Sequence, residues 1–428
     1  MKGRCGVGQF RRLLRVSSVP LFVVRCAVVV ITSVAVGLHV FGEFGDPGLS
    51  WQVGTYRFDL DVYRLGGQLW LHGGRLYDTV LVTREGTPES FTYPPLAAVL
   101  FSPLALAPLQ VDGALLVLIS IALTGIVVAV TLNSQGYRPT AWGLAAIASV
   151  ALLLEPVRTT LALGQINLVL LAAVVADVLL AGVLWPRGLL VGLASAVKLT
   201  PLVAVLFFVL RGQRRAAVVG LLSFTGATAL GAALAPRDSL RYWTWAVFAV
   251  DRIGKPTRPA NQSLRAVVAR LGLSGPVGVV VWALAAVVVF GLAIVAARQA
   301  LRASQPGLAL VLVAVAGLLA SPISWAHHWV WCLPALLILA DLGRVHRIPR
   351  WLAITGLVLF LTPAYQFLPF PPDHWALWQQ AADAGYALWA LLLLTATAIT
   401  GHQWSRPTAQ TPSPAAARDT SASRPCPP

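Results

Sequence analysis

The chain has 428 residues, of which 57% are hydrophobic and 11% are charged, and its mean hydropathy is +0.75. Soluble domains carry about 25% charged residues, so this composition excludes an ordinary soluble protein and indicates a polytopic membrane protein. The net charge of +16 comes from short basic clusters between apolar runs, a pattern typical of loops that face an anionic membrane surface. Because nucleic-acid binding needs a continuous basic surface, we expect no nucleic-acid partner.

The two ends of the chain differ from its apolar centre. The N-terminus is basic and precedes an apolar run that is longer than a signal-peptide core and lacks a clear cleavage site, so we expect a retained anchor. The last residues are rich in Pro, Ser, Thr and Ala without apolar periodicity, which is typical of disorder. The sequence therefore predicts a basic cytoplasmic tail at 1–18, a membrane domain at 19–402 and a disordered cytoplasmic tail at 403–428.

About twelve apolar segments approach the roughly 20 residues that a helix needs to cross a bilayer. They are 19–42, 95–109, 113–132, 141–155, 165–184, 188–209, 216–235, 276–296, 306–321, 329–342, 352–369 and 384–400. With twelve spans, the short basic loops fall on one side, which the positive-inside rule makes cytoplasmic. The predicted fold class is all-α, with about 12 transmembrane helices and a large first extracytoplasmic loop. The same parity puts the GQIN motif at 164–167 on the cytoplasmic side.

The loop at 42–93 gathers several carboxylates beside membrane-spanning sequence, above all in FDLDVYRLGG at 58–67. On a helix, side chains two residues apart diverge by about 200°, so Asp59 and Asp61 share a face only in an extended segment. If the segment is helical, we expect one carboxylate to act and the other to be structural. Spacing alone leaves a second interpretation open, in which both are solvated acids at the membrane surface.

Further polar side chains stand at the ends of apolar segments. Lys198 is flanked by apolar residues, so it either forms a salt bridge with Asp177 or binds a phosphate. Tyr93 precedes two prolines that suit a helix start, and its hydroxyl either binds a polar ligand or joins an aromatic belt. Asn261 and Gln262 suit sugar hydroxyls, although the same stretch can be an N-cap before the next helix. The exported region 236–276 is unexpectedly basic, so either the topology differs there or its cations meet an anion.

The segment SPISWAHHWVW at 321–331 concentrates aromatic and histidine side chains at the mouth of an apolar segment. An aromatic belt accounts for the tryptophans. It does not account for His327 and His328, which have no charge partner nearby in the sequence, and such residues favour a binding role. A metal site needs further ligands at definite spacing, and none is evident. We therefore expect neither a metal nor another cofactor.

Taken together and in order, six motifs resemble those of glycosyltransferase family 87. They are DLDVY at 59–63, FTYPP at 91–95, GQIN at 164–167, KLTP at 198–201, NQSL at 261–264 and SWAHHW at 324–329. The resemblance covers about residues 19–400. It implies the membrane GT-C fold and a polyprenyl-phosphate-mannose-dependent α-mannosyltransferase of the mycobacterial envelope, acting with inversion at the outer face of the plasma membrane on a lipid-anchored mannoside.

The resemblance also implies roles for single residues. It assigns the catalytic base to Asp59, with Asp61, at the motif's variable position, as the alternative. A histidine that helps to hold the donor falls on either His327 or His328. The other predicted site residues are Lys198, Tyr93, Asn261 and Gln262 at the donor's phosphate or sugar, and Tyr63 and Trp325 at the acceptor.

The expected chemistry suits these residues. A lipid phosphate leaves as a stabilised anion that needs little protonation, so one carboxylate suffices where glycosidases use two. The preferred acceptor is the mannan core of lipomannan and lipoarabinomannan, which would receive α-(1→2) branches, and the runner-up is elongation of phosphatidylinositol mannosides. A transporter or flippase for a polyprenyl-linked glycan is an alternative of another class, but it predicts two repeated halves, and the sequence shows no such symmetry. An inactive assembly partner is a further alternative.

Overall fold

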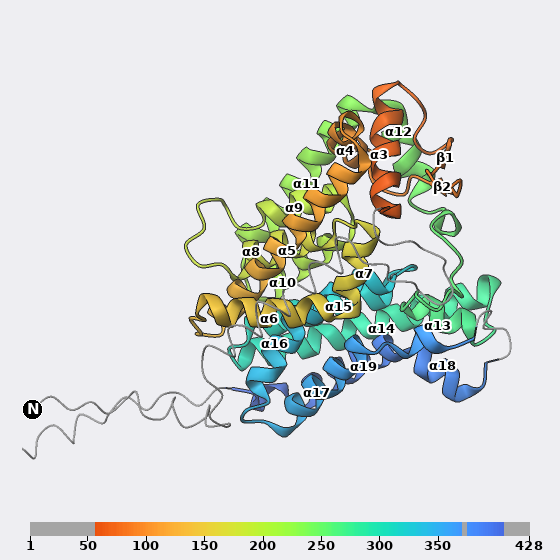
Figure 1. The fold of residues 1–428 in the computed structure, drawn as a ribbon. Helices are drawn as coiled ribbons and strands as arrows, with labels where there is room; N and C mark the ends of the chain where they lie inside the picture. The colour runs from red at the N-terminus through yellow and green to blue at the C-terminus, as the bar shows by residue number, and fades with distance from the viewer. Residues whose placement is uncertain (1–55, 370–374, 406–428) are drawn as a thin grey trace, which may run out of the picture.

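The computed structural model describes residues 56–369 and 375–405. The predicted first span and both predicted tails lie outside these residues, apart from 403–405. The described chain is a bundle of helices with one small antiparallel hairpin, in which β1 (Val80–Val82) pairs with β2 (Pro88–Ser90) (Figure 1). The all-α prediction therefore holds apart from this hairpin.

Within the described ranges, five helices are long and apolar enough to cross a membrane, or six if one bent pair is counted as a single span. The long helices are α5 (Leu109–Ser134), α11 (Arg214–Leu234) and α14 (Gly275–Arg302), together with α17 (Arg347–Leu361) and α19 (Gly385–Thr400), whose spans include the turns after them and run over Arg347–Phe367 and Gly385–Gln403. The bent pair is α6 (Ala141–Leu153) with α7 (Glu155–Leu163). The membrane-protein prediction agrees with these spans, whereas the number twelve stays a prediction.

Shorter apolar helices lie between the long ones. They are α4 (Pro95–Phe101), α8 (Asn167–Leu179), α9 (Leu189–Val197), α10 (Ala204–Leu210), α15 (Pro306–Ala320) and α16 (Cys332–Leu342). Helix α15 is apolar on every side and almost wholly buried, as expected of a helix at the centre of a bundle. Its neighbour α14 turns the small residues Ala293, Ala296 and Ala300 inward, so the two backbones approach closely, and exposes valines and leucines on its other faces.

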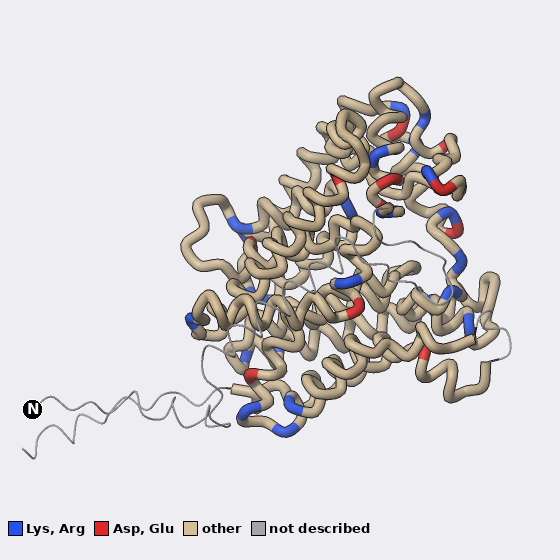
Figure 2. The backbone as a smooth tube through the Cα atoms, viewed as in Figure 1, with Lys and Arg blue, Asp and Glu red and all other residues tan. Residues whose placement is uncertain are grey.

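The polar end of the molecule comprises α3 (Phe58–Leu71), the hairpin, α12 (Pro236–Arg241), α13 (Leu264–Arg270) and α18 (Leu377–Asp383), which lie along the right-hand side of Figure 1. Figure 2 shows charged residues gathered at this end and at the opposite lower left, with few between them. Helix α3 packs on α4 and the turn after it at Gly67. A Cβ on Gly67 would meet the backbone of Phe101 at 2.7 Å, so this close packing requires glycine.

Candidate functional site

Helix α3 gives Asp59 and Asp61 separate surroundings, as the helical spacing requires. Asp61 is 4% exposed. Its Oδ2 accepts hydrogen bonds from the Tyr56 hydroxyl at 2.9 Å and from the backbone N–H of Arg84 at 2.8 Å. Asp61 therefore ties α3 to the turn of the hairpin. Asp59 is partly exposed and faces away from these partners, so it is the carboxylate with room for a ligand.

The side chain of Gln165 lies beside the Asp59 carboxylate, which also lies within the field of Lys198. Burial raises the pKa of Asp59 to about 6, Gln165 and Lys198 oppose this rise, and the nearby Glu89 adds to it. A carboxylate with this pKa is ionised at neutral pH. It is also a stronger base than an ordinary aspartate.

Gln165 connects Asp59 to the rest of the site. Its Oε1 accepts hydrogen bonds from the hydroxyl of Tyr63 at 2.5 Å, the hydroxyl of Tyr93 at 3.3 Å and Nζ of Lys198 at 3.4 Å. The two tyrosine hydroxyls are themselves 2.9 Å apart. Tyr63 is 1% exposed, so its predicted contact with an acceptor is replaced by a place in this buried network.

Lys198 connects Gln165 to the segment that contains His327 and His328. Its Nζ donates to Oδ1 of Asn167 at 2.9 Å and lies 3.3 Å from Nε2 of His328. Because an ammonium group only donates, Nε2 of His328 is the acceptor and its Nδ1 carries the proton. The side-chain amide of Asn167 also donates to the backbone carbonyl of His327 at 2.9 Å. Among the described residues, Nδ1 of His328 and Nε2 of His327 are buried without a partner.

Two expectations are corrected by this network. Asp177 does not pair with Lys198, because its carboxylate accepts from the indole of Trp185 and from the backbone N–H groups of Gly188 and Val191. The GQIN motif cannot lie on the opposite side of the membrane from Asp59, because Gln165 contacts that carboxylate. The physical reason is the 76° bend between α6 and α7, because the span count ended at residue 155 and treated as a loop the residues that form α7 and lead the motif back to α3.

A turn at Gly164 places Gln165 against α3. Gly164 ends α7 with a φ of +70°, a conformation that favours glycine. It also lies so close to α3 that a Cβ at this position would stand 2.8 Å from Cβ of Leu60. The backbone N–H of Gln165 returns to the carbonyl of Thr160 at 2.9 Å, which closes the turn.

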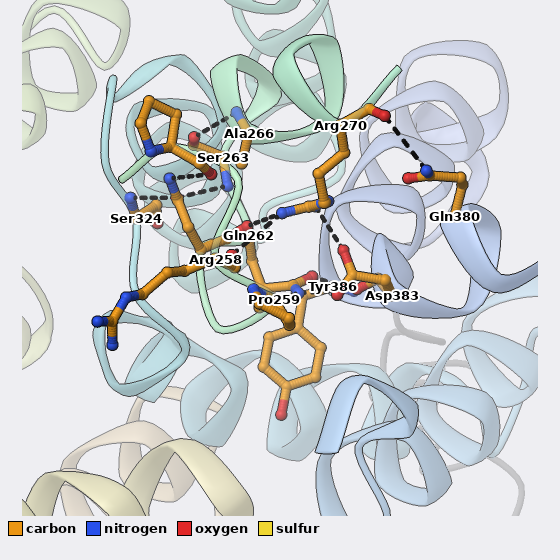
Figure 3. Close-up of polar contacts among 12 residues, drawn as sticks. Arg258, Pro259, Gln262, Ser263, Ala266, Arg270, Ser324, Gln380, Asp383 and Tyr386 are labelled. Atoms are coloured by element: carbon orange, nitrogen blue, oxygen red, sulfur yellow. Dashed lines mark hydrogen bonds and ion pairs between the residues drawn. The ribbon is translucent and has the colours of Figure 1, made fainter. Parts of the chain in front are cut away.

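Asn261 and Gln262 are fully buried, and their amides bind backbone groups. Figure 3 shows Gln262 among these contacts. Oδ1 of Asn261 accepts from the backbone N–H of Ser324 at 2.9 Å, and Nε2 of Gln262 donates to the carbonyl of Asp383 at 2.7 Å. The two amides hold the segment that contains the histidines, and their place at the donor sugar stays a prediction. The N-cap alternative is confirmed, because Oγ of Ser263 accepts from the backbone N–H of Ala266.

A buried ion pair supports the same loop. Arg270 of α13 and Asp383 of α18 approach to 2.6 Å, with exposures of 1% and 0%. Figure 3 shows the Arg270 guanidinium pointing from α13 to this carboxylate, and Nη1 of Arg270 also donates to the carbonyl of Asn261 at 3.0 Å. Arg241 pairs with Asp78 and Arg265 with Asp251. Several cations of the basic region 236–276 thus meet carboxylates. The sequence had left two explanations for the basic charge of this region, a different topology or pairing with an anion, and these contacts agree with the second.

Trp325 stays outside the Asp59 network. It lies in the same turn as the histidines, and its ring covers Gly254, where a Cβ would approach the ring to 2.9 Å. Within the described residues, no group of three or more His, Cys, Asp or Glu side chains is arranged to hold a metal ion.

The sequence analysis quoted the motif of Gln165 and Asn167 but gave neither residue a role. The available signal was two polar amides directly after a glycine, at the junction of two apolar helices. Of the residues that it did name, the structure joins Asp59, Tyr63, Tyr93, Lys198 and His328 in one network, to which the backbone of His327 is tied.

An apolar cavity of about 330 Å³ begins where this network ends. His328 and Asn167 form part of its polar wall, and most of the remaining wall is apolar, with Leu170 of α8, Ala204 of α10 and Leu318 of α15 among its residues. The site therefore has a carboxylate at one end, cationic and imidazole groups in the middle and an apolar chamber at the other end.

Comparison with known proteins gives consistent matches. Residues 91–322 match glycosyltransferase family 87. A Mycobacterium tuberculosis protein, named as a polyprenol-phosphate-mannose-dependent alpha-(1-2)-phosphatidylinositol mannoside mannosyltransferase, is 36% identical over 396 residues, covering 88% of this chain and 91% of the relative. A Mycolicibacterium smegmatis protein of the same name is 40% identical over 365 residues, covering 79% and 83%. No solved structure matches the chain.

Proposed function

The chain belongs to glycosyltransferase family 87 and is a glycosyltransferase, and on that premise we propose that it transfers mannose from polyprenyl-phosphate-mannose to a phosphatidylinositol mannoside in an α-(1→2) linkage. The names of the relatives support this donor and this acceptor. Those names favour the acceptor that the sequence analysis placed second, ahead of the mannan core of lipomannan. The proposed site of transfer is the extracytoplasmic face of the plasma membrane.

The observation that carries the proposal is the continuous path from Asp59 through Gln165 and Lys198 to His328 and the apolar cavity. A polyprenyl-phosphate sugar has the same sequence of parts: a polar sugar, an anionic phosphate and an apolar chain. We assign the start of the isoprenoid chain to the cavity, where each CH₂ removed from water contributes about 0.8 kcal/mol. The phosphate then lies beside Lys198 and His328, and the sugar lies toward Asp59.

In the proposed reaction, Asp59 accepts the proton of the acceptor hydroxyl as its oxygen attacks C1 of mannose. The new C1–O bond forms on the face opposite the phosphate, the C1–O bond to the phosphate breaks, and a β-linked donor gives an α-linked product. Proton transfer to a positioned base contributes about 100- to 10,000-fold in rate. A pKa of about 6 suits this role, because the carboxylate is free of a proton at neutral pH.

The leaving phosphate gains charge as the bond breaks, and Lys198 is the cation placed to stabilise it. His328 presents Nδ1–H as a second donor, because Lys198 occupies its Nε2. Nε2 of His327 is a further unpartnered buried atom that a phosphate or sugar hydroxyl can satisfy. Asp61 has no part in these steps, since its carboxylate is buried and holds Tyr56 and the backbone of Arg84.

The test is transfer of radiolabelled mannose from mannosyl-phospho-decaprenol in membranes that contain the protein, with purified phosphatidylinositol mannosides as acceptor. We expect labelled product whose new linkage is α-(1→2), and inhibition by unlabelled decaprenyl phosphate. Membranes with the Lys198→Met variant are the control for adventitious transferases. Label found only in lipomannan would refute the acceptor, and no transfer above the control membranes would refute the activity.

A further inference from the structure

Gln165 stands between two groups of opposite charge that would otherwise attract each other. Its side chain lies beside the Asp59 carboxylate, and its Oε1 lies 3.4 Å from Nζ of Lys198. Among the ion pairs of residues 56–369 and 375–405, none joins Asp59 to Lys198. Gln165 itself is only 4% exposed, so little water is available to separate these charges.

The chemistry at its two ends fixes the orientation of the Gln165 amide. An ammonium group has only donors, so the amide oxygen must face Lys198, and the hydroxyls of Tyr63 and Tyr93 donate to the same oxygen. An ionised carboxylate has only acceptors, so the NH₂ group must face Asp59. A flipped amide would set its N–H groups against Lys198 and its oxygen against Asp59.

A direct ion pair in this place would impair both groups. An opposite charge within about 4–6 Å lowers the pKa of an aspartate by about 1–3 units, which would make Asp59 a weaker base. The same contact would occupy the ammonium group that the donor phosphate needs. The amide instead gives each group one hydrogen bond. A carboxylate has about four acceptor positions, so Asp59 can keep this bond and still accept a proton.

We propose that Gln165 is a positioning residue that holds the base Asp59 and the phosphate-binding Lys198 apart while it orients both. This inference rests on the proposed function, in which Asp59 is the base and Lys198 binds the donor. It also explains why the GQIN turn is built so tightly, because Gly164 brings Gln165 against α3.

The inference is tested by the pH dependence of kcat/KM in detergent-purified protein, for Gln165→Ala, Gln165→Glu and Gln165→Asn. The groups that face Asp59 are Lys198, Glu89 and the hydroxyls of Tyr63 and Tyr93, and none is altered. In Gln165→Ala the ammonium can close on the carboxylate, so the acid limb moves down by about one pH unit or more, and the donor KM rises. In Gln165→Glu a new carboxylate competes for Lys198, so the acid limb moves up.

Gln165→Asn keeps the amide on a shorter side chain, and we expect it to recover part of the rate with an acid limb near the wild-type position. Gln305→Ala removes another buried glutamine, at the start of α15, and is the matched control with an unchanged limb. Rate losses in the Ala and Glu variants with unmoved acid limbs would overturn the inference, because a merely structural role predicts that result. A wild-type protein that transfers no mannose would instead refute the proposed function.

Discussion

Gly164→Ala is a sharp test of the site's construction, because it adds one carbon atom at the turn that places Gln165. The left-handed conformation at a φ of +70° costs a residue with a Cβ about 1–2 kcal/mol. The new Cβ would also stand 2.8 Å from Cβ of Leu60 and 2.9 Å from Cβ of Arg57. Ordinary contact begins near 3.4 Å, so α3 must move by about 0.6 Å, and such overpacking costs about 1–3 kcal/mol.

Together these effects predict a loss of about 2–5 kcal/mol in stability for Gly164→Ala. They also predict a loss of transfer rate, because α3 carries Asp59 and a displacement near 1 Å costs about 100-fold in rate. Gly182→Ala is the matched control. Gly182 has a φ of +65° but no atom within 4 Å of the added Cβ, so it loses only the conformational part.

The assay compares thermal unfolding and mannose transfer of the two variants in detergent. We expect Gly182→Ala to keep the wild-type rate with a small drop in Tm, and Gly164→Ala to lose both stability and rate. Equal behaviour of the two variants would refute the account of the turn, because it would mean that the approach of Gly164 to α3 does not position the site.

Three further predictions follow from the contacts around the site. Asp61→Asn lowers stability by about 1–3 kcal/mol, because Tyr56 and Arg84 lose a charged acceptor. It leaves the transfer rate per folded molecule near wild type. Loss of transfer with an unchanged Tm would instead assign the base to Asp61. Arg270→Leu leaves the buried Asp383 carboxylate without its cation and lowers stability by about 3–5 kcal/mol. The double variant with Asp383→Leu recovers most of that stability in thermal unfolding. A double variant as unstable as Arg270→Leu would contradict this prediction. The kcat/KM of the wild type is highest above pH 6 and falls as the pH drops through the pKa of Asp59, about 6. The reason is that a protonated carboxyl cannot accept a proton. A profile that is flat from about pH 5 to 8 would contradict this prediction.

The composition and the motifs predicted a helical membrane protein and named most of the residues that the structure joins around Lys198, because apolar length and polar residues at helix ends are local properties. The break between α6 and α7 had a local signal too, since Pro156 follows Glu155 and disfavours a continuous helix. Span counting ended a segment near this break, but it treated residues 156–164 as a loop and not as part of a second helix. The partners of Glu155 were not predictable, since Tyr365 and Tyr386, which hold its carboxylate at 2.8 and 2.6 Å, lie more than 200 residues away.

Spacing alone could not separate Asp59 from Asp61. On the helix it shows only that the two side chains diverge, and the separation comes from Tyr56 and Arg84, which occupy Asp61. The backbone partners of the buried Asn261 and Gln262 could not be predicted for a related reason. An asparagine or glutamine looks the same in the sequence whether its amide binds a sugar or backbone groups. Only the fold shows that Ser324 lies beside Asn261.

The account depends on a carboxylate of α3 that takes a proton from the acceptor beside a lipid-phosphate sugar. The most direct measurement is single-turnover transfer of labelled mannose by Asp59→Asn, together with its binding of decaprenyl phosphate. We predict that donor binding and Tm stay near wild type while the transfer step slows by about 100-fold or more. Transfer by Asp59→Asn at the wild-type rate would contradict the account.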